Sequence, residues 1–341
     1  MKLIPAFVGV TLVSSALAQP VQPPPPTSAP VGALLSTAPV LTITNGTIIA
    51  KVARIDAARG FYNGTRFDQA GVVTSLTLNG KDFYGPWFER LAPDVLDYTY
   101  MGEDVVAGPD SATSGPVEEF APLNFEARPG TFIKPGVGLL YQPDTQPYDH
   151  YRHYRVLDAG ERTTRVTKTS VTFTQKLSSG GFGYIYEKTL RLVPGKPQLV
   201  ISHRLRNVGA KPINTNVYDH NFLKLVPGNG GVTVTFPFAP AAVSTPPADL
   251  LRIPGKTLTY LRPMANKERI SFLVTGFGNS DADYDFTIAG GGASVRVQGD
   301  HPVARLNVFS IDRVQSVEPY IDIDLAPGAE KQWTYIYSFT R

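Results

Sequence analysis

Apolar and polar residues alternate with a period of two from about Leu41 to the C-terminus, and this pattern constrains the fold more than any other feature. Such alternation is typical of β-strands with one buried face, and no stretch shows the spacing of a helical stripe. Turn dipeptides separate the runs at Asn79-Gly80, Pro194-Gly195 and Pro327-Gly328, and we expect a strand pair around each. The sequence therefore predicts an all-β protein, a large antiparallel β-sandwich.

The first eighteen residues have the pattern of an export signal. Lys2 precedes an apolar run that ends in the small-x-small sequence Ala16-Leu17-Ala18, so we expect cleavage before Gln19. No later segment approaches the ~20 apolar residues that a membrane-spanning helix needs. We therefore predict an exported protein, secreted or periplasmic, without a membrane span.

Residues 19–40 are rich in proline and include the run "QPVQPPPP". Proline lacks the backbone donor of a sheet ladder and fixes its own φ, so we expect a disordered tether. The folded domain is then expected to comprise residues 41–341.

Composition excludes some partners and one source of stability. The chain has no cysteine, so its stability has to come from a large core rather than from disulfides. Its 32 basic and 29 acidic residues are well mixed, with a net charge of +3. Because there is no basic patch, we expect no nucleic-acid partner.

The segment "INTNVYDHNF", residues 213–222, carries a histidine within a strand-like run. Parity places Asn216, Tyr218, His220 and Phe222 on one face and most aliphatic residues on the other. A polar and aromatic face suits a sugar, whose hydroxyls need hydrogen bonds and whose C–H face packs on aromatic rings. A solvent-facing strand with a hydrogen-bonded histidine is the alternative interpretation.

Three segments resemble the aldose 1-epimerase (galactose mutarotase) family. The segment "LVISHRLRNVGAKPINTNVYDHNFLKL" is similar to its central strands and places His220 at the general acid, although Asp219 stands where the family usually has asparagine. The segment "SVEPYIDIDLAPGAEKQWTYIYSF" is similar to its C-terminal motif and places Glu318 at the catalytic base. The segment "GTRFDQAGVVTSLTLNGKDFYG" looks like its opening hairpin. The resemblance implies a galactose mutarotase-like sandwich and covers most of the chain after Leu41, thinly over residues 81–149 and 232–302.

The implied reaction explains these residue types. Interconversion of sugar anomers removes the proton of the anomeric hydroxyl and protonates the ring oxygen, so that the open aldehyde rotates and closes on the other face. A carboxylate and an imidazole on opposite sides of one sugar ring supply the base and the acid near neutral pH. Such a reaction needs no cofactor and no metal, and its partner is a sugar or an oligosaccharide.

One feature of the family is missing here, the "H-G" loop whose histidine holds the substrate. The candidates for this role are His150 and His153 in "YDHYRHYRVLD", and we expect His153 because it leads directly into a strand-like run. A surface cluster of aromatic and basic residues is the alternative. Their spacing is a weak metal signal because no third ligand lies nearby.

Further binding residues are expected near the N-terminal hairpin and on the His220 face. Arg66 and Asp68 in "GTRFD" are candidate hydrogen-bond partners of the sugar, with an ordinary turn ion pair as the alternative. Asn216 and Tyr218 share the face of His220 and are candidates for the same role.

Other charged residues are expected to be structural. Glu118 and Glu119 lie with Lys134 in loops punctuated by glycine and proline, and a solvated acid pair is the default for the two glutamates. His203 shares parity with aliphatic residues, so we expect it to be a buried or hydrogen-bonded structural histidine.

Two other functions remain open on the same fold, since one fold hosts unrelated activities. A non-catalytic carbohydrate-binding protein would explain the missing "H-G" loop. A polysaccharide lyase would use Tyr218 or His220 as base and Arg66 as cationic partner. The retention of both His220 and Glu318 favours the epimerase.

Overall fold

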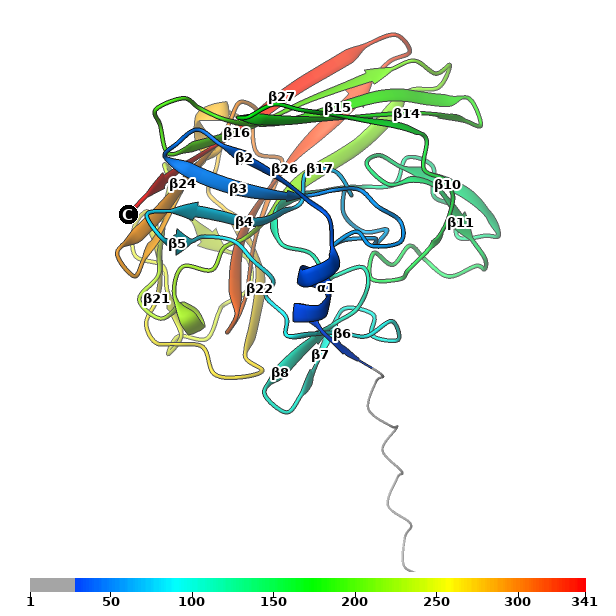
Figure 1. The fold of residues 1–341 in the computed structure, drawn as a ribbon. Helices are drawn as coiled ribbons and strands as arrows, with labels where there is room; N and C mark the ends of the chain where they lie inside the picture. The colour runs from blue at the N-terminus through cyan, green and yellow to red at the C-terminus, as the bar shows by residue number, and fades with distance from the viewer. Residues whose placement is uncertain (1–27) are drawn as a thin grey trace, which may run out of the picture.

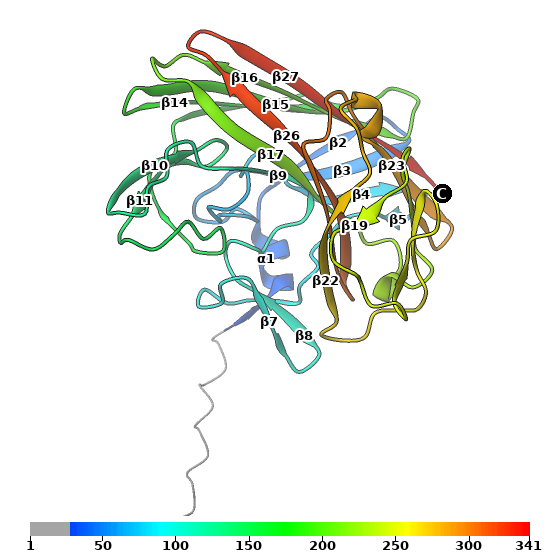
Figure 2. The ribbon, with the colours of Figure 1, turned by 180° about the vertical axis from the view of Figure 1, so that it is seen from behind.

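The computed structural model describes residues 28–341. Its largest sheet has ten strands, and Figures 1 and 2 show its long strands along the top of the molecule. In spatial order they are β13 (Glu161–Val166), β14 (Ser170–Ser179), β15 (Phe182–Leu192), β16 (Gln198–Asn207), β27 (Glu330–Thr340), β24 (Ala293–Gly299), β23 (Asp285–Gly290), β18 (Thr233–Thr235), β21 (Thr257–Tyr260) and β20 (Leu251–Arg252).

A six-stranded sheet lies below it and carries the segment around His220. Figure 2 shows three of its strands, β9, β17 and β26, running below the long strands of the ten-stranded sheet. Its spatial order is β19 (Ala241–Ala242), β22 (Arg269–Thr275), β25 (Arg305–Ile311), β26 (Val314–Leu325), β17 (Ile213–Phe222) and β9 (Gly115–Phe120), all antiparallel.

Three smaller sheets complete the described part of the chain. They are β2 (Val40–Thr44), β3 (Ile48–Ala53), β4 (Val73–Leu78) and β5 (Lys81–Asp82); β10 (Gly130–Lys134), β11 (Gly138–Gln142) and β12 (Arg155–Asp158); and β1 (Ala29–Pro30), β6 (Arg90–Leu91), β8 (Asp104–Ala107) and β7 (Tyr98–Met101). The helical elements are α1 (Val31–Thr37) and two 3₁₀ turns, η1 (Pro227–Asn229) and η2 (Asp281–Asp283). The predicted all-β sandwich is confirmed.

The main core fills the space between the sheets and explains how a cysteine-free chain holds together. It takes buried residues from β2–β4 and from both large sheets, including Trp333, Tyr184 and Tyr337. A second cluster lies on the other side of β17 and includes Phe67, Trp87 and Phe222. The odd-numbered residues of β17, such as Val217, therefore face the main core. The even-numbered residues, such as Phe222, face the second cluster.

The turn predictions are partly confirmed. Asn79 and Gly80 both have positive φ, 49° and 75°, and link β4 to β5 as a tight hairpin. Pro194-Gly195 links the paired strands β15 and β16. The pair expected around Pro327-Gly328 is wrong, because β26 belongs to the six-stranded sheet and β27 to the ten-stranded one. The chain changes sheets at this turn, which lets the apolar faces of both strands line the core.

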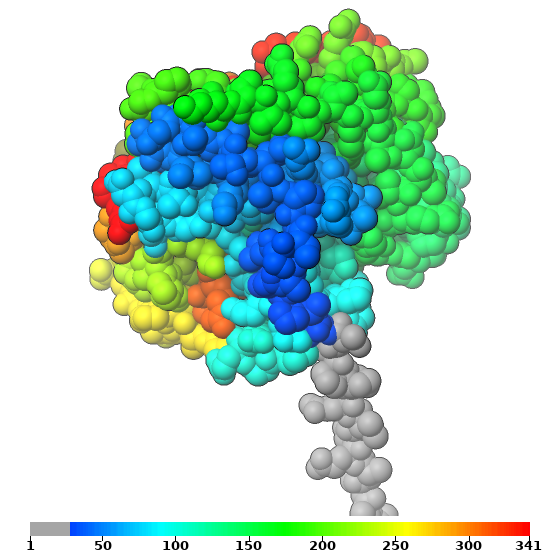
Figure 3. Space-filling model, in the orientation of Figure 1, coloured from blue at the N-terminus to red at the C-terminus, as the bar shows by residue number. Residues whose placement is uncertain are grey.

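The N-terminal segment differs from the predicted tether. Residues 1–27, which include the expected signal, lie outside the described residues. From residue 28 onward, however, the chain forms β1, which pairs with β6, and α1. Val31 and Leu34 of α1 pack on the second cluster, and this burial orders a segment whose prolines alone predict disorder. Figure 3 shows this blue segment lying against cyan residues on the surface.

Among residues 28–341, no helix combines the length and apolar character that crossing a membrane requires.

Candidate functional site

The site begins with two rows of side chains that cross adjacent strands of the six-stranded sheet. In the first row Tyr218 of β17 lies opposite Glu119 of β9 on one side and Tyr320 of β26 on the other. Tyr218 and Tyr320 stack with ring centroids 4.3 Å apart, and the guanidinium of Arg305 lies 3.6 Å from the centroid of Tyr320. Directly opposed residues of antiparallel strands have close Cβ atoms, so the register itself brings these groups together.

The second row contains His220 and Glu318. The register that pairs Tyr218 with Tyr320 continues to the bridge between Leu223 and Gln315, so His220 lies opposite Glu318. His220 Nε2 is 3.1 Å from Glu318 Oε1, and both side chains are 5% exposed. On the next strand Asn307 lies opposite Glu318, and its amide donates to Glu318 Oε2 at 2.9 Å.

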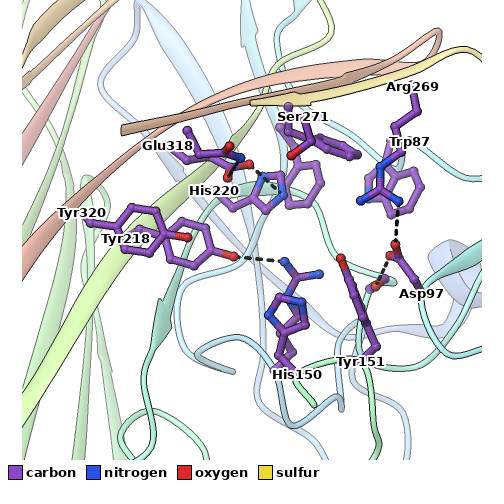
Figure 4. A pocket seen from close by; sticks show the side chains of 15 residues that line it. Trp87, Asp97, His150, Tyr151, Tyr218, His220, Arg269, Ser271, Glu318 and Tyr320 are labelled. Atoms are coloured by element: carbon purple, nitrogen blue, oxygen red, sulfur yellow. Dashed lines mark hydrogen bonds and ion pairs between the residues drawn. The ribbon is translucent and has the colours of Figure 1, made fainter. Parts of the chain in front are cut away.

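These rows form one wall of a pocket of ≈130 Å³ (Figure 4). Arg269 and Ser271 of β22 extend this wall in the same sheet, and loops form the rest of the pocket. The lining residues are Arg66, Trp87, Asp97, Ser111, His150, Tyr151, Tyr218, His220, Phe222, Arg269, Ser271, Asn307, Phe309, Glu318 and Tyr320. The pocket therefore combines aromatic rings with hydrogen-bonding groups, a lining that suits a small polar ligand with C–H surfaces.

Aromatic side chains hold His220 in place. Its ring stacks on Phe222 with centroids 3.6 Å apart and planes 5° apart, and it meets Phe67 and Phe309 edge-on at 5.7 Å. Burial disfavours the imidazolium and, together with the charge of Arg66, holds the pKa of His220 well below 6.5. His220 is therefore neutral near neutral pH.

Burial shifts the pKa of Glu318 in the opposite direction to that of His220. Burial raises its pKa from 4.5 to about 7, although the hydrogen bond from Asn307 lowers it. His220 Nδ1, Glu318 Oε1 and Trp87 Nε1 are buried and make no hydrogen bond to the described residues, because the 3.1 Å contact of the pair is not aligned as one. Buried polar atoms without partners are rare, so this wall has unused hydrogen-bonding capacity.

A buried ion network supports the other end of the pocket. Arg66 donates through Nε to Glu119 Oε2 at 2.8 Å and through Nη2 to the hydroxyl of Tyr218 at 3.0 Å, and Tyr218 donates to the same Glu119 oxygen at 2.6 Å. Lys134 Nζ and His150 Nδ1 each lie 3.3 Å from Glu119 Oε1. Burial alone would raise the pKa of Glu119, but the charges of Lys134 and Arg66 outweigh it and hold the pKa well below 4.5.

The structure brings four of the predicted site residues together and places three elsewhere. Arg66, Tyr218, His220 and Glu318 line the pocket, whereas Asp68, His153 and Asn216 do not. Asn216 lies on β17 but farther along the strand, opposite Asp322 and half-buried.

Asp68 is turned into the core rather than into the pocket. It is fully buried, accepts a hydrogen bond from Tyr186 at 3.1 Å and lies 3.5 Å from Lys188. Residues 65–70 form an irregular segment rather than a strand, so alternation does not keep Asp68 on the side of Arg66.

His153 lies outside the pocket and His150 takes the inner position. The half-exposed ring of His153 contacts Asp110 Oδ2 at 3.1 Å, and this contact raises its pKa. The expectation from strand proximity fails because residues 149–152 form a turn that directs His150, not His153, toward Glu119.

The predicted solvated pair Glu118–Glu119 is wrong, because both side chains are buried on opposite faces of β9. Glu119 faces the pocket network, and Glu118 faces the main core, where it contacts Lys188 and His203 Nε2, the latter at 2.8 Å. The prediction that His203 is a structural histidine is confirmed, since its side chain is fully buried and stacked on Trp333.

Several lining residues were not singled out from the sequence. Trp87 and Tyr151 lie in loops, and Arg269 lies on β22. The sequence alone does not reveal which strands lie beside β22. Asn307 could have been found from the register, because it lies opposite Glu318. Among residues 28–341 no group of three or more histidine, aspartate or glutamate side chains is arranged to hold a metal ion.

Comparison with known proteins finds similarity of fold to solved structures. No family model matches the sequence, and no curated protein matches it. Among solved structures, a candidate aldose 1-epimerase from Escherichia coli K12 is similar, with a TM-score of 0.53 and 12% identity over 89% of this chain and 99% of that one. A GalM/aldose epimerase homologue from Caenorhabditis elegans has a TM-score of 0.52 and 12% identity over 89% and 99% of the two chains. A galactose mutarotase-like protein from Lactobacillus casei has a TM-score of 0.50 and 12% identity over 89% and 100%.

Proposed function

The chain has the galactose mutarotase-like fold, and we propose that it is an aldose 1-epimerase-like enzyme that interconverts sugar anomers by acid/base catalysis at His220 and Glu318. The observation that carries the proposal is the direct contact of these two side chains, 3.1 Å apart, at the wall of a polar and aromatic pocket. Their unused hydrogen-bonding atoms and the similarity of fold support it.

The contact between the two residues fits the geometry of the reaction. The anomeric hydroxyl oxygen and the ring oxygen are both bonded to the anomeric carbon, so the base and the acid have to reach two oxygens that lie side by side. The expected placement of the base and the acid on opposite sides of the sugar ring is wrong, because the two side chains meet at 3.1 Å. Two adjacent side chains on one wall serve both oxygens of a sugar that approaches from the pocket.

The reaction balances as follows. One member of the pair removes the proton of the anomeric hydroxyl, the O–H electrons form the aldehyde C=O, and the bond from the anomeric carbon to the ring oxygen breaks. The other member donates its proton to the ring oxygen, which becomes a hydroxyl. Rotation about the bond next to the aldehyde, followed by the reverse transfers, gives the other anomer and restores the pair.

The pair therefore works with one proton bound between its two members. Because burial lowers the pKa of His220 and raises that of Glu318 to about 7, the proton resides on Glu318 before the reaction begins. Neutral His220 then acts as the base and Glu318 as the acid, with the roles exchanged when the ring closes. This order is the reverse of the one that the family resemblance implies.

The small volume of the pocket favours a single sugar unit. Sites that enclose drug-sized ligands measure about 300–1,000 Å³, and this pocket is smaller at ≈130 Å³. The rings of Trp87, Phe309 and Tyr320 offer surfaces to its C–H faces, and Asn307 and Tyr218 offer hydrogen bonds.

The test is anomer exchange measured by polarimetry and by NMR on a panel of freshly dissolved aldoses, with and without the protein. The proposal expects faster exchange for at least one aldose. Binding of oligosaccharides without any acceleration would instead identify a carbohydrate-binding protein.

We also propose that the protein is exported, which rests on the sequence pattern of residues 1–18. Cell fractionation followed by N-terminal sequencing of the mature chain tests this. A mature protein in the cytoplasm that retains Met1 would contradict it.

A further inference from the structure

The charged side chains that line the pocket indicate a property of the substrate that the acid/base chemistry does not determine. Two arginines line the pocket, Arg66 and Arg269, and both are charged at any physiological pH. The lining carboxyl groups are Asp97 and Glu318, and burial raises the pKa of Glu318 to about 7, so that near neutral pH it offsets little positive charge. The pocket thus holds two fixed positive charges against one fixed negative charge.

Arg66 is held rigidly and is short of counter-charge. Its guanidinium lies between the rings of Phe67 and Tyr151, 4.4 and 4.9 Å from their centroids. Its partner Glu119 is shared with Lys134, whose side chain is fully buried. One carboxylate therefore faces two basic side chains in a buried network, although burial lowers the pKa of Lys134. A bound anion would add counter-charge to this network.

Arg269 approaches the same region from β22. It lies 3.7 Å from Asp97 Oδ2, beyond hydrogen-bonding distance, and Asp97 also accepts a hydrogen bond from Ser111 at 2.9 Å. Figure 4 shows Tyr151 standing between the His150 side of the pocket and the Arg269–Asp97 side. The charges of Arg66 and Arg269 both act on the hydroxyl of Tyr151. The side chains of Arg66 and Arg269 therefore line the same pocket as Tyr151.

We propose, resting on the proposed function, that the substrate is an acidic aldose whose carboxylate binds between Arg66 and Arg269 beside Tyr151. Guanidinium groups match the planar shape of a carboxylate and bind it through paired hydrogen bonds. Arg66 uses Nε and Nη2 for Glu119 and Tyr218, which leaves Nη1 for the ligand. The two arginines thereby select uronic acids over the corresponding neutral hexoses.

The test compares galacturonate and glucuronate with galactose and glucose in the anomer-exchange assay, with hexose 6-phosphates as a further arm. Wild-type protein is expected to act on at least one uronate with a kcat/KM at least tenfold above that on the matching neutral sugar. Arg269→Gln is expected to remove most of this preference, by lowering kcat/KM on the uronate at least tenfold more than on the matching neutral sugar. The matched control is Arg296→Gln on β24, where the exposed arginine pairs with Asp285 far from the pocket lining.

The outcomes separate this inference from the proposed function. Equal or better activity on neutral sugars would overturn the inference and leave the epimerase intact, and a preference for hexose 6-phosphates would overturn the carboxylate in favour of a phosphate. If no sugar is anomerised, the binding of uronates is measured by calorimetry, and it tests whether the pocket takes an acidic ligand. Binding that weakens at least tenfold in Arg269→Gln supports an acidic ligand without the catalysis, and the absence of uronate binding overturns the inference.

Discussion

His220 of β17 and Glu318 of β26 are opposed residues in one antiparallel register, and their side chains meet at 3.1 Å. They are about a hundred positions apart in the chain, yet the sheet makes them neighbours. Their environments shift the two pKa values toward each other, because burial disfavours the charge on both. This relationship underlies the first three predictions.

Removal of either member of the pair is expected to abolish most catalysis. His220→Ala and Glu318→Gln should each lower kcat/KM for anomer exchange by roughly 10²–10⁴-fold, the usual contribution of a positioned proton-transfer group. Glu330→Gln, at an exposed glutamate of β27 that pairs with Arg204, is the control and should keep full activity. Variants that stay folded, as judged by near-ultraviolet circular dichroism, but retain wild-type rates would remove the pair from the mechanism.

The pH–rate profile is expected to be bell-shaped with its optimum below pH 7. Above about pH 7 Glu318 loses its proton, and the pair has none to donate. Below the lowered pKa of His220 the pair holds two protons, and it can accept none. The measurement is kcat/KM from about pH 4 to about pH 9. A rate that rises through pH 7 and then stays constant would show that the fully deprotonated pair is the active form.

Glu318 is also expected to make folding stability depend on pH. Its folded-state pKa lies above the ordinary 4.5, so its contribution is fully present below pH 4.5 and is lost as the pH rises through about 7. The loss amounts to about 3 kcal/mol, at ~1.4 kcal/mol per pH unit. Glu318→Gln should therefore match wild type in urea unfolding near pH 4 and exceed it by up to about 3 kcal/mol near pH 8. If the difference in unfolding free energy between Glu318→Gln and wild type were the same at both pH values, the carboxyl group of Glu318 would not be desolvated.

The two neighbouring histidines are expected to behave differently. His150 lines the pocket and lies 3.3 Å from Glu119, whereas His153 is outside the pocket on Asp110. His150→Ala should raise KM or lower kcat/KM by about tenfold or more, at ~1.4 kcal/mol for each factor of ten. His153→Ala should leave both unchanged. The reverse result would restore the sequence-based choice of His153.

The buried ion cluster around Lys188 is expected to matter for stability. Lys188 contacts Glu118 and lies 3.5 Å from Asp68, and all three side chains are fully buried. Lys188→Met leaves two carboxylates without their cation and should cost about 3–5 kcal/mol in the free energy of unfolding. Lys176→Met, which breaks the exposed pair with Glu161 in the same sheet, should cost less than about 1 kcal/mol. Equal costs for the two variants would contradict this account.

Local patterns predicted the parts of this protein that depend on local geometry. Alternation with a period of two identified the strands, and Asn79-Gly80 identified a tight hairpin through its positive φ angles. Parity correctly put Tyr218, His220 and Phe222 on one face of β17. The sequence resemblance pointed to His220 and Glu318, and the register of the sheet brings them together.

The tertiary structure alone decided which charged groups are buried and what faces them. Parity shows that Glu118 and Glu119 point to opposite faces of their strand. Only the tertiary structure shows that the ten-stranded sheet covers one face and that loops cover the other. The places of Asp68, His150 and His153 depend on how a loop turns over the sheet, and no local pattern encodes that path. Likewise, Arg66 and Arg269 lie about two hundred positions apart and line one pocket only because the loop that carries Arg66 packs near the sheet that contains β22. Burial and electrostatic coupling are sums over contacts distant in the chain, so they exist only once the chain has folded.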